Sequence, residues 1–306
     1  MQSDNCQINA GKMSNLDDFT PQLTADGSFT FFSPDFQEAF HSHHGAKQES
    51  FLKFVEPTQL KKQAEKPHLK LLDICYGLGY NTAAALQRIW QTNPDCCVEI
   101  IALELNPHVP QSAIKHQLFV DWNYPYLDIL TELAFSYQVK AANIKAELLV
   151  GDARNTLRQV QQSGFVADAI FLDPFSPPQC PHLWTLEFLK MVAQCLHLEG
   201  YLATYSCAAA VRQALLDANL DIGSTPPVGR RSPGTVAAHH PLSHLYPLSL
   251  EETEHLLTRA AIPYRDPELQ DTANTIIQRR QQEQTNSSLE TTSQWRKRWQ
   301  QNKRVD

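Results

Sequence analysis

Three features that define other classes of protein are missing from the sequence. No uninterrupted apolar run approaches the roughly 18 residues of a membrane-spanning helix, and the polar start Met1–Asn5 lacks the basic and apolar regions of a signal peptide. The seven cysteines include no Cys-x-x-Cys pair, and none lies near a histidine at zinc-finger spacing. We therefore expect a cytoplasmic protein with reduced thiols, no metal site and no membrane partner.

Basic residues are also in the minority, because 26 Lys and Arg stand against 33 Asp and Glu, which gives a formal net charge of -7. This balance argues against a protein that binds nucleic acid unspecifically over its whole surface. RNA binding stays open because two local basic clusters exist, Gly229-Arg230-Arg231 and the tail 295–304. The 306 residues, 42% of them hydrophobic, suffice for one sizeable α/β domain with extensions or for two small domains.

The most informative stretch is 69–82, where a short apolar run is followed by two glycines and a helix start. This order predicts a strand, a tight turn and a helix N-terminus, the place where open α/β sheets bind nucleotides. Gly77 and Gly79 would let backbone N–H groups approach a ligand. The third glycine of the dinucleotide fingerprint is missing, and Asp73 lies inside the strand end. The pattern favours S-adenosylmethionine (SAM) over NAD; a plain βα turn without a ligand is the alternative.

Strand and helix patterns alternate from residue 69 onward, as a parallel sheet with crossover helices requires. The predicted fold is α/β, a Rossmann-like class I SAM-dependent methyltransferase with a mostly parallel twisted sheet and helices on both faces. The segment 107–144 is longer than a minimal crossover and is expected to build the substrate wall. Strands are expected at 69–75, 97–104, 146–150, 167–173 and 200–206, helices at about 80–91, 153–162, 182–197 and 208–219, and a closing antiparallel pair at 220–223 and 235–238.

The methyltransferase domain is predicted at 67–240, between two segments of different composition. Residues 1–66 comprise a polar leader followed by a small β and helical extension. Residues 241–306 form a helical extension, which includes a short helix with a capping box at Ser249 and Glu252. The basic tail after about residue 285 is expected to be disordered.

Two further strand ends carry acids. An acid at the carboxyl end of the second strand of a nucleotide-binding sheet accepts hydrogen bonds from the ribose hydroxyls, and Glu104 has this position; an exposed strand-end carboxylate is the alternative. Asp152 could accept from the adenine amino group while the N–H of neighbouring Ala153 serves a ring nitrogen; an N-cap is its other interpretation. Asn81, at the helix start after the glycine turn, is assigned to the same cofactor site.

The fourth strand runs into Asp173-Pro174-Phe175-Ser176, a proline-stiffened loop with an aromatic side chain. If the acceptor is an alkyl amine, its pKa near 10.4 leaves only about one part in a thousand as free base at neutral pH. A carboxylate can take or hold the extra proton. Asp173 and the Pro174 carbonyl would orient the amine, and Phe175 could stack on a planar base. The loop resembles the Asp-Pro-Pro-Tyr loop of exocyclic-amine methyltransferases; a strand-end aspartate before a proline turn is the alternative.

These motifs together resemble the MnmC-type methyltransferase family, the methyltransferase half of the bifunctional enzyme that finishes 5-methylaminomethyl-2-thiouridine at the tRNA wobble position. The resemblance covers roughly 24–240. The family's FAD-dependent oxidase domain is absent from these residues, and Pro follows Asp173 where the bifunctional form has Gly. The motifs are Asp73-Ile-Cys-Tyr-Gly77-Leu-Gly79-Tyr-Asn81, Asp168-Ala-Ile-Phe-Leu-Asp173-Pro-Phe-Ser-Pro177, Leu183-Trp184-Thr185, 202–212, Gly229-Arg230-Arg231 and the segment 26–46.

The resemblance implies SAM-dependent N-methylation of 5-aminomethyl(-2-thio)uridine in the anticodon region of tRNA, without the oxidase step. Asp173 would be the amine-orienting base. The substrate would contact Pro174, Phe175, Ser176, Arg230 and Arg231.

Two other functions stay open from the residues alone. A small-molecule amine methyltransferase, or a polyamine-type aminopropyl transferase, would suit the acidic net charge and needs no RNA surface. A non-catalytic RNA-binding module with the same fold is the third possibility. Transfer of label from SAM to tRNA or to a polyamine separates the two enzyme classes, and absence of SAM binding would favour the third.

Overall fold

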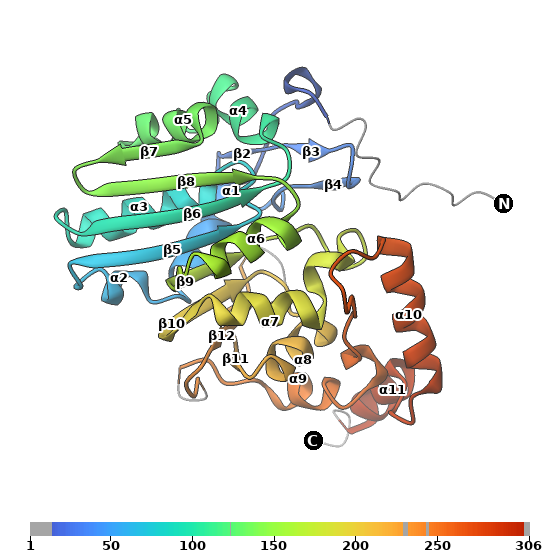
Figure 1. Cartoon of the computed structure of the whole chain (residues 1–306). Coiled ribbons are helices and arrows are strands. Elements are labelled where there is room, and N and C mark those ends of the chain that lie inside the picture. The colour runs from blue at the N-terminus through green and yellow to red at the C-terminus, as the bar shows by residue number, and fades with distance from the viewer. Residues whose placement is uncertain (1–13, 123, 229–231, 243–244, 303–306) are drawn as a thin grey trace.

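The computed structural model describes residues 14–122, 124–228, 232–242 and 245–302. Within these ranges the chain forms an eight-stranded sheet with the strand order β11-β12-β10-β9-β5-β6-β8-β7 (Figure 1). The parallel strands are β5 (His68–Ile74), β6 (Cys97–Glu104), β8 (Ile144–Val150), β9 (Ala167–Leu172) and β10 (Leu196–Thr204), and the antiparallel strands are β7 (Gln138–Ala141), β11 (Asp221–Ser224) and β12 (Thr235–Ala238).

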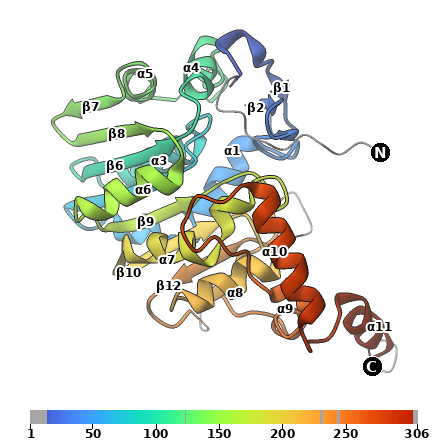
Figure 2. The ribbon, with the colours of Figure 1, turned by 45° about the vertical axis from the view of Figure 1, so that its right-hand side comes forward.

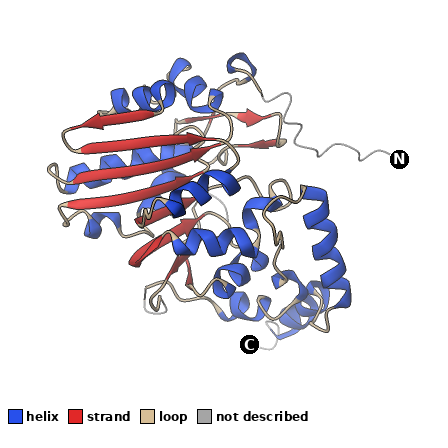
Figure 3. Ribbon diagram, in the orientation of Figure 1, coloured by secondary structure: helices blue, strands red, loops and turns tan. Residues whose placement is uncertain are grey.

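Helices cover both faces of the sheet (Figures 2 and 3). Successive side chains of a strand point to opposite faces, so Leu71 packs in the apolar cluster of one face and Leu72 in that of the other. Both faces of the central strands are therefore buried, which explains their continuous apolar runs. The predicted Rossmann-like α/β fold is confirmed. The helices are α3 (Tyr80–Thr92), α4 (His108–Lys115) and α5 (Leu127–Ser136) on one face, and α6 (Ala153–Gln162), α7 (Leu186–Gln194) and α8 (Ala209–Asp217) on the other.

Most predicted elements occur at their predicted positions, with one helix divided. The second strand and the helix at 153–162 have the predicted bounds, and the closing pair β11–β12 is antiparallel as expected. The helix predicted at 182–197 is instead a 3₁₀-turn at Pro181–Trp184 followed by α7. Thr185 separates them, because its hydroxyl accepts a hydrogen bond from the Phe188 N–H and starts a new helix.

The described residues before the sheet, 14–67, fold compactly onto it. The expected leader falls partly on residues 1–13, which lie outside the described part, while Phe19 is buried and its ring stacks on Phe31 at 5.4 Å. Two small antiparallel hairpins follow, and the expected β extension is present. Its elements are a 3₁₀-turn (Leu16–Asp18), β1 (Gln22–Leu23), β2 (Phe29–Thr30), β3 (Phe32–Ser33), β4 (Glu38–Ala39), α1 (Ala46–Glu49), a π-helical segment (Ser50–Val55) and α2 (Leu60–Gln63).

The C-terminal extension is helical to Asn302, so the expected disorder after about residue 285 is wrong for the described residues. The reason is tertiary contact: the Trp295 ring stacks on His255 at 4.6 Å, and Arg298 forms an ion pair with Glu254. The predicted capping box at Ser249 is present. The elements are α9 (Leu250–His255), a 3₁₀-turn (Arg259–Ala261), α10 (Ala273–Asn286) and α11 (Thr292–Asn302). No helix among the described residues is both long and apolar enough to cross a membrane.

Candidate active site

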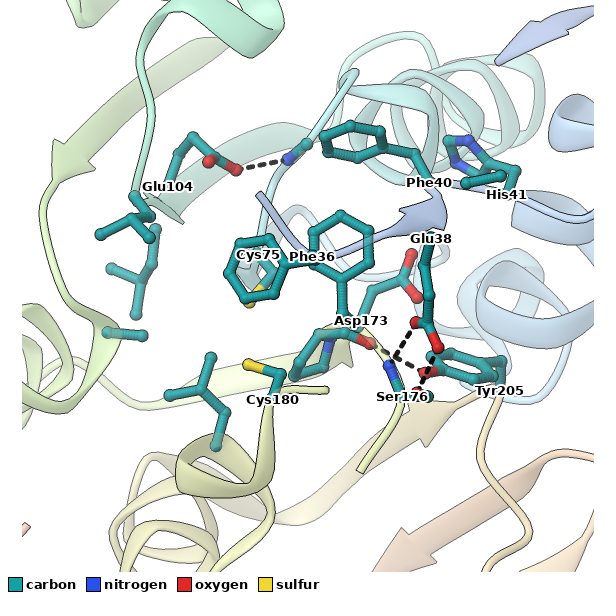
Figure 4. A pocket seen from close by; sticks show the side chains of 18 of the residues that line it. Phe36, Glu38, Phe40, His41, Cys75, Glu104, Asp173, Ser176, Cys180 and Tyr205 are labelled. Carbon is teal, nitrogen blue, oxygen red and sulfur yellow. Dashed lines mark hydrogen bonds between the residues drawn. The ribbon is translucent and has the colours of Figure 1, made fainter. Parts of the chain in front are cut away.

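A cavity of about 810 Å³ lies where the parallel strands end. Its floor comes from the segments that follow β5, β6, β8 and β9, and the opposite wall comes from the hairpin β3–β4 and the residues after it (Figure 4). The size is typical of pockets for small molecules and cofactors. A ligand at this edge of an open α/β sheet would contact side chains from several strands at once.

The glycine turn after β5 has the expected left-handed backbone, and its two glycines have different roles. Gly77 (φ +56°) lines the cavity and donates its N–H to Glu104. Gly79 (φ +87°) lies outside the cavity lining, and a Cβ there would come within 2.7 Å of the Tyr76 hydroxyl. Gly79 is therefore required by packing and by the start of α3.

Glu104 is buried at the cavity edge, where its carboxylate accepts from two backbone N–H groups, and Figure 4 draws one of these bonds. The donors are Gly77 at 2.8 Å and Asn106 at 2.9 Å. Burial raises the pKa of Glu104, and these hydrogen bonds offset part of that rise. These two bonds fix the carboxylate at the cavity edge, and each oxygen keeps a lone pair that could accept from a ribose hydroxyl.

Asp152 is the N-cap of α6 and also part of the cavity lining, while its contact with adenine stays a prediction. As the N-cap, its carboxylate accepts the Arg154 N–H at 2.9 Å. Burial raises its pKa, but the hydrogen bonds and charge of Arg154 outweigh burial, and the net shift is downward. Ala153, the first residue of α6, lines the cavity too. An α-helix leaves the N–H of its first residue without an intrahelical partner, so this N–H can serve a ligand.

Asp73 does not line the cavity, unlike the cofactor-binding position assigned to it from the sequence. It is completely buried in β5, and one oxygen accepts a hydrogen bond from the Thr82 hydroxyl at 2.7 Å. Burial raises its pKa to about 7, the Thr82 bond opposes that rise, and the charge of Glu104 adds to it. The geometry places Asp73 between β5 and α3, where it joins strand and helix.

Asn81 likewise lies behind the cavity lining, although the sequence grouped it with the cofactor residues. Its side chain is 3% exposed, and Nδ2 donates to Oδ2 of Asp173 at 2.8 Å. The segment after β5 therefore supplies a cavity-lining backbone at Gly77 and, four residues later, a side chain that contacts Asp173.

The acceptor loop, residues 173–176, lines the cavity over its whole length, and its contact with substrate stays a prediction. Its backbone carbonyls are held by aromatic side chains: the Tyr205 hydroxyl donates to the Pro174 carbonyl at 2.9 Å, and Trp184 Nε1 donates to the Phe175 carbonyl at 2.8 Å. The Pro174 carbonyl, which is expected to accept from the amine together with Asp173, thus already accepts one hydrogen bond and keeps one lone pair.

The side chains of the acceptor loop contact the N-terminal hairpin. The Phe175 ring stacks on Phe36 with centroids 4.4 Å apart, and Phe40 meets it edge-on at 5.0 Å. Glu38 accepts from the Ser176 N–H at 2.9 Å and from its hydroxyl. One face of the Phe175 ring is therefore covered by protein, which limits the base stacking expected from the sequence.

The predicted substrate wall also differs from the structure. No described residue of 107–144 lines the cavity; the insertion packs instead against α3, with Trp122 stacked on Tyr80 at 5.6 Å. The wall comes from the N-terminal hairpin, whose lining residues went unassigned because their partners lie far away in sequence. The similarity of 26–46 to a family segment was the available signal. The predicted substrate residues Arg230 and Arg231 lie outside the described residues.

The cavity lining fits SAM at the end formed by β5, β6 and β8. Gly77 has no Cβ at a left-handed turn, Glu104 offers oriented acceptors, and Ala153 offers an N–H donor. Together with Asp152, these residues would hold the cofactor. Methyl transfer needs an acceptor beside it, and the acceptor loop occupies the remaining side of the same cavity.

Fold and site together define a class I SAM-dependent methyltransferase, and residues 116–240 match the family model described as S-adenosyl-L-methionine-dependent methyltransferase. The crystal structure of MnmC2 from Aquifex aeolicus superposes with a TM-score of 0.75 at 31% identity, and the match covers 91% of this chain and 88% of that one. The chain belongs to the MnmC-type methyltransferase family, which confirms the resemblance seen in the motifs and SAM as the cofactor.

Two relatives show how much of the chain is shared. An uncharacterised protein of Methanocaldococcus jannaschii is 32% identical over 265 residues, which cover 85% of this chain and 70% of that protein. The tRNA 5-methylaminomethyl-2-thiouridine biosynthesis bifunctional protein MnmC of Ralstonia nicotianae is 29% identical, and the match covers 72% of this chain but 34% of that protein. The chain thus matches about one third of the bifunctional relative.

Proposed function

We propose that this protein transfers the methyl group of SAM to the amine nitrogen of 5-aminomethyluridine, or its 2-thio form, at the wobble position of tRNA. The observation that carries the proposal is Asp173, whose carboxylate lines the cavity that also contains the cofactor-side residues Gly77 and Glu104. The tRNA acceptor is supported by the name of the Ralstonia relative, which is a tRNA-modifying protein.

The first task of the site is to hold an amine with its lone pair available. An alkylammonium ion has no lone pair, so a proton must leave before transfer, and a carboxylate beside the nitrogen can accept it. We assign this role to Asp173. The orientation of that carboxylate is fixed by the Asn81 amide at 2.8 Å, which leaves the amine a defined acceptor. Bound SAM supplies the electrophilic methyl group.

The second task is to exclude water from the reacting groups. Phe36 and Phe40 line the same cavity as Asp173 (Figure 4), and both rings contact the ring of Phe175 to form an aromatic cluster. Apolar surroundings favour the neutral amine over its cation, because burial disfavours the charged form. An aminomethyl group that enters between Asp173 and this cluster would lose its proton more readily than in water.

The remaining substrate contacts follow from the same proposal. The uridine would approach the acceptor loop at Pro174, Phe175 and Ser176, and Arg230 and Arg231 would contact phosphates of the anticodon region. No step in the proposed reaction is an oxidation, so the chain would act on an amine that another enzyme has already exposed.

A labelled-SAM assay tests the proposal. Purified protein is incubated with methyl-labelled SAM and either undermodified tRNA or free polyamines, and the labelled nucleoside is identified after digestion of the tRNA. Label in 5-methylaminomethyluridine is the expected result. Label in polyamine but not in tRNA would assign the protein to small-molecule methylation, and calorimetry showing no SAM binding would leave a non-catalytic RNA-binding role.

A further inference from the structure

Arg154 connects the cofactor end of the cavity with the C-terminal extension. At one end its Nε and Nη2 donate to the Asp152 carboxylate, with Nη2 at 2.7 Å. At the other end Nη1 donates to Oδ2 of Asp266 at 3.1 Å and to the carbonyl of Asp271 at 3.0 Å. A single planar guanidinium thus joins the N-cap of α6 to a loop more than 100 residues later in the chain.

Asp266 is built into this position rather than exposed to solvent. Its side chain has no solvent exposure, and its second oxygen accepts the N–H groups of Gln270 and Asp271, each at 3.1 Å. A buried carboxylate needs such donors and a cation, because an unpaired charge in the interior is costly. The residue that supplies the cation, Arg154, also lines the cavity.

The loop that carries Asp266 is docked by contacts of its own. The Asp266 N–H donates to Glu187 of α7 at 2.8 Å, and Arg265 forms an ion pair with the same glutamate. The Tyr264 carbonyl accepts the Leu186 N–H at 3.0 Å. Loss of the Arg154 contact would therefore leave residues 264–266 docked on α7 and loosen the loop at Gln270 and Asp271, which are held through Asp266 and Arg154.

We propose that the C-terminal extension completes the SAM site, because Asp266 holds Arg154, and Arg154 holds Asp152 and the start of α6 in the geometry that binds the cofactor. The inference rests on the proposed assignment of Asp152 and Ala153 to SAM. Fixing an arginine side chain costs conformational entropy. Because Asp266 already fixes Arg154 in the free protein, SAM binding does not have to supply the free energy for that ordering. SAM binding and the order of the loop 264–271 are therefore coupled, and the coupling is reciprocal.

The variant Asp266→Asn tests the coupling with little other change. Its remaining oxygen can still accept from Gln270 and Asp271, while its Nδ2 faces Arg154 and cannot accept. We expect the Kd for SAM, measured by calorimetry, to rise on the order of tenfold. The control is Glu254→Gln, which removes a carboxylate paired with Arg298 in the same extension but outside the cavity lining, and it should bind SAM as the wild type does.

The outcomes separate this inference from the proposed function. If the wild type binds SAM and Asp266→Asn binds it within twofold, the coupling is refuted while the function stands. If the wild type binds no SAM, both are refuted.

Hydrogen exchange of the wild-type protein gives a test that needs no variant and so does not depend on whether Asp266→Asn folds. Saturating SAM should slow exchange of the Gln270 and Asp271 amides, which donate to Asp266. The amide of Trp295, which donates within the extension to the Thr291 carbonyl, should exchange at an unchanged rate. Unchanged exchange at Gln270 and Asp271 would overturn the inference.

Discussion

The side-chain amide of Asn81 donates a hydrogen bond of 2.8 Å to the carboxylate of Asp173, across 92 positions of sequence. A carboxylate only accepts hydrogen bonds, so Asn81 must direct its amide nitrogen to Asp173. The amide oxygen of Asn81 is buried without a hydrogen-bond partner. The amide orientation is therefore set by Asp173 alone. The first turn of α3 thereby contacts the acceptor loop from behind the cavity lining.

Replacement of Asn81 by alanine is expected to lower kcat without weakening SAM binding. The Asp173 carboxylate would lose its fixed donor, and misplacement of a catalytic group by about 1 Å can cost 100-fold in rate. SAM affinity should hold because Asn81 does not line the cavity. Steady-state kinetics with calorimetry of SAM binding check this, and a raised Kd for SAM with unchanged kcat would return Asn81 to the cofactor role predicted from the sequence.

Replacement of Asp173 by alanine should remove most turnover, by roughly 100- to 10,000-fold, because proton removal from the amine loses its acceptor. SAM should still bind. If Asn81 acts through Asp173, adding Asn81→Ala to the Asp173→Ala variant should lower activity little further. Single-turnover methylation of tRNA measures both effects. Wild-type turnover of Asp173→Ala would remove this residue from the proposed mechanism.

Local sequence patterns predicted the fold and two acidic residues that line the cavity, Glu104 and Asp152. An apolar run followed by glycines determines a strand and a turn, and Glu104 and Asp152 were found because the carboxyl ends of parallel strands meet at one sheet edge. The same rule misplaced Asp73. Its side chain lies within the strand and bonds to Thr82, and alternation along a strand does not tell whether a side chain faces the ligand or the next helix.

Local sequence patterns could not predict contacts between segments that are far apart in the chain. Glu38 meets Ser176 across 138 positions, and nothing near Glu38 in the sequence specifies that partner. The insertion 107–144 was predicted to contact the substrate because of its length, but aromatic side chains such as Trp122 are buried by packing on α3. The tail after 285 is polar in composition, and its docking depends on long-range contacts such as the Trp295–His255 stack and the Arg298–Glu254 ion pair.

Replacement of Asp73 by asparagine should change how stability depends on pH. The pKa of Asp73 in the folded protein is about 7, above its ordinary value of 3.8. The stability that this carboxyl contributes is therefore fully present below about pH 4 and is lost as pH rises through about 7. Asp73→Asn should be more stable than the wild type at pH 8, on the order of 2 kcal/mol, and the gain should shrink by pH 5.

Urea unfolding of both proteins at pH 5 and pH 8 gives this difference directly. The comparison at each pH cancels the titration of other groups such as His41 and His182, whose pKa values burial lowers to about 4. A gain that is equal at the two pH values would contradict the assigned burial effect. SAM affinity of the variant should match the wild type, because Asp73 lies outside the cavity lining.

Replacement of Glu38 by alanine should impair the acceptor side of the site. The N–H and hydroxyl of Ser176 would lose their acceptor, and the hairpin would lose its polar attachment to the acceptor loop. We expect about a tenfold loss in kcat/KM for the tRNA acceptor, with the Kd for SAM unchanged. Asp35→Asn is the matched control, because Asp35 bonds to Ser14 and does not line the cavity. Equal losses in both variants would point to general destabilisation of the hairpin.

The double variant Arg230→Glu with Arg231→Glu should weaken tRNA binding and reduce its dependence on salt. Each phosphate contact to a single-stranded region contributes about 0.7 to the slope of log K against log salt concentration, so two lost contacts should make the slope shallower by about 1.4. The control reverses two charges of the exposed tail helix, Arg296→Glu with Lys297→Glu, and should alter the slope less. Binding is measured at several salt concentrations with undermodified tRNA. An unchanged slope in the Arg230 and Arg231 variant would place the RNA surface elsewhere, with the insertion 107–144 the next segment to test.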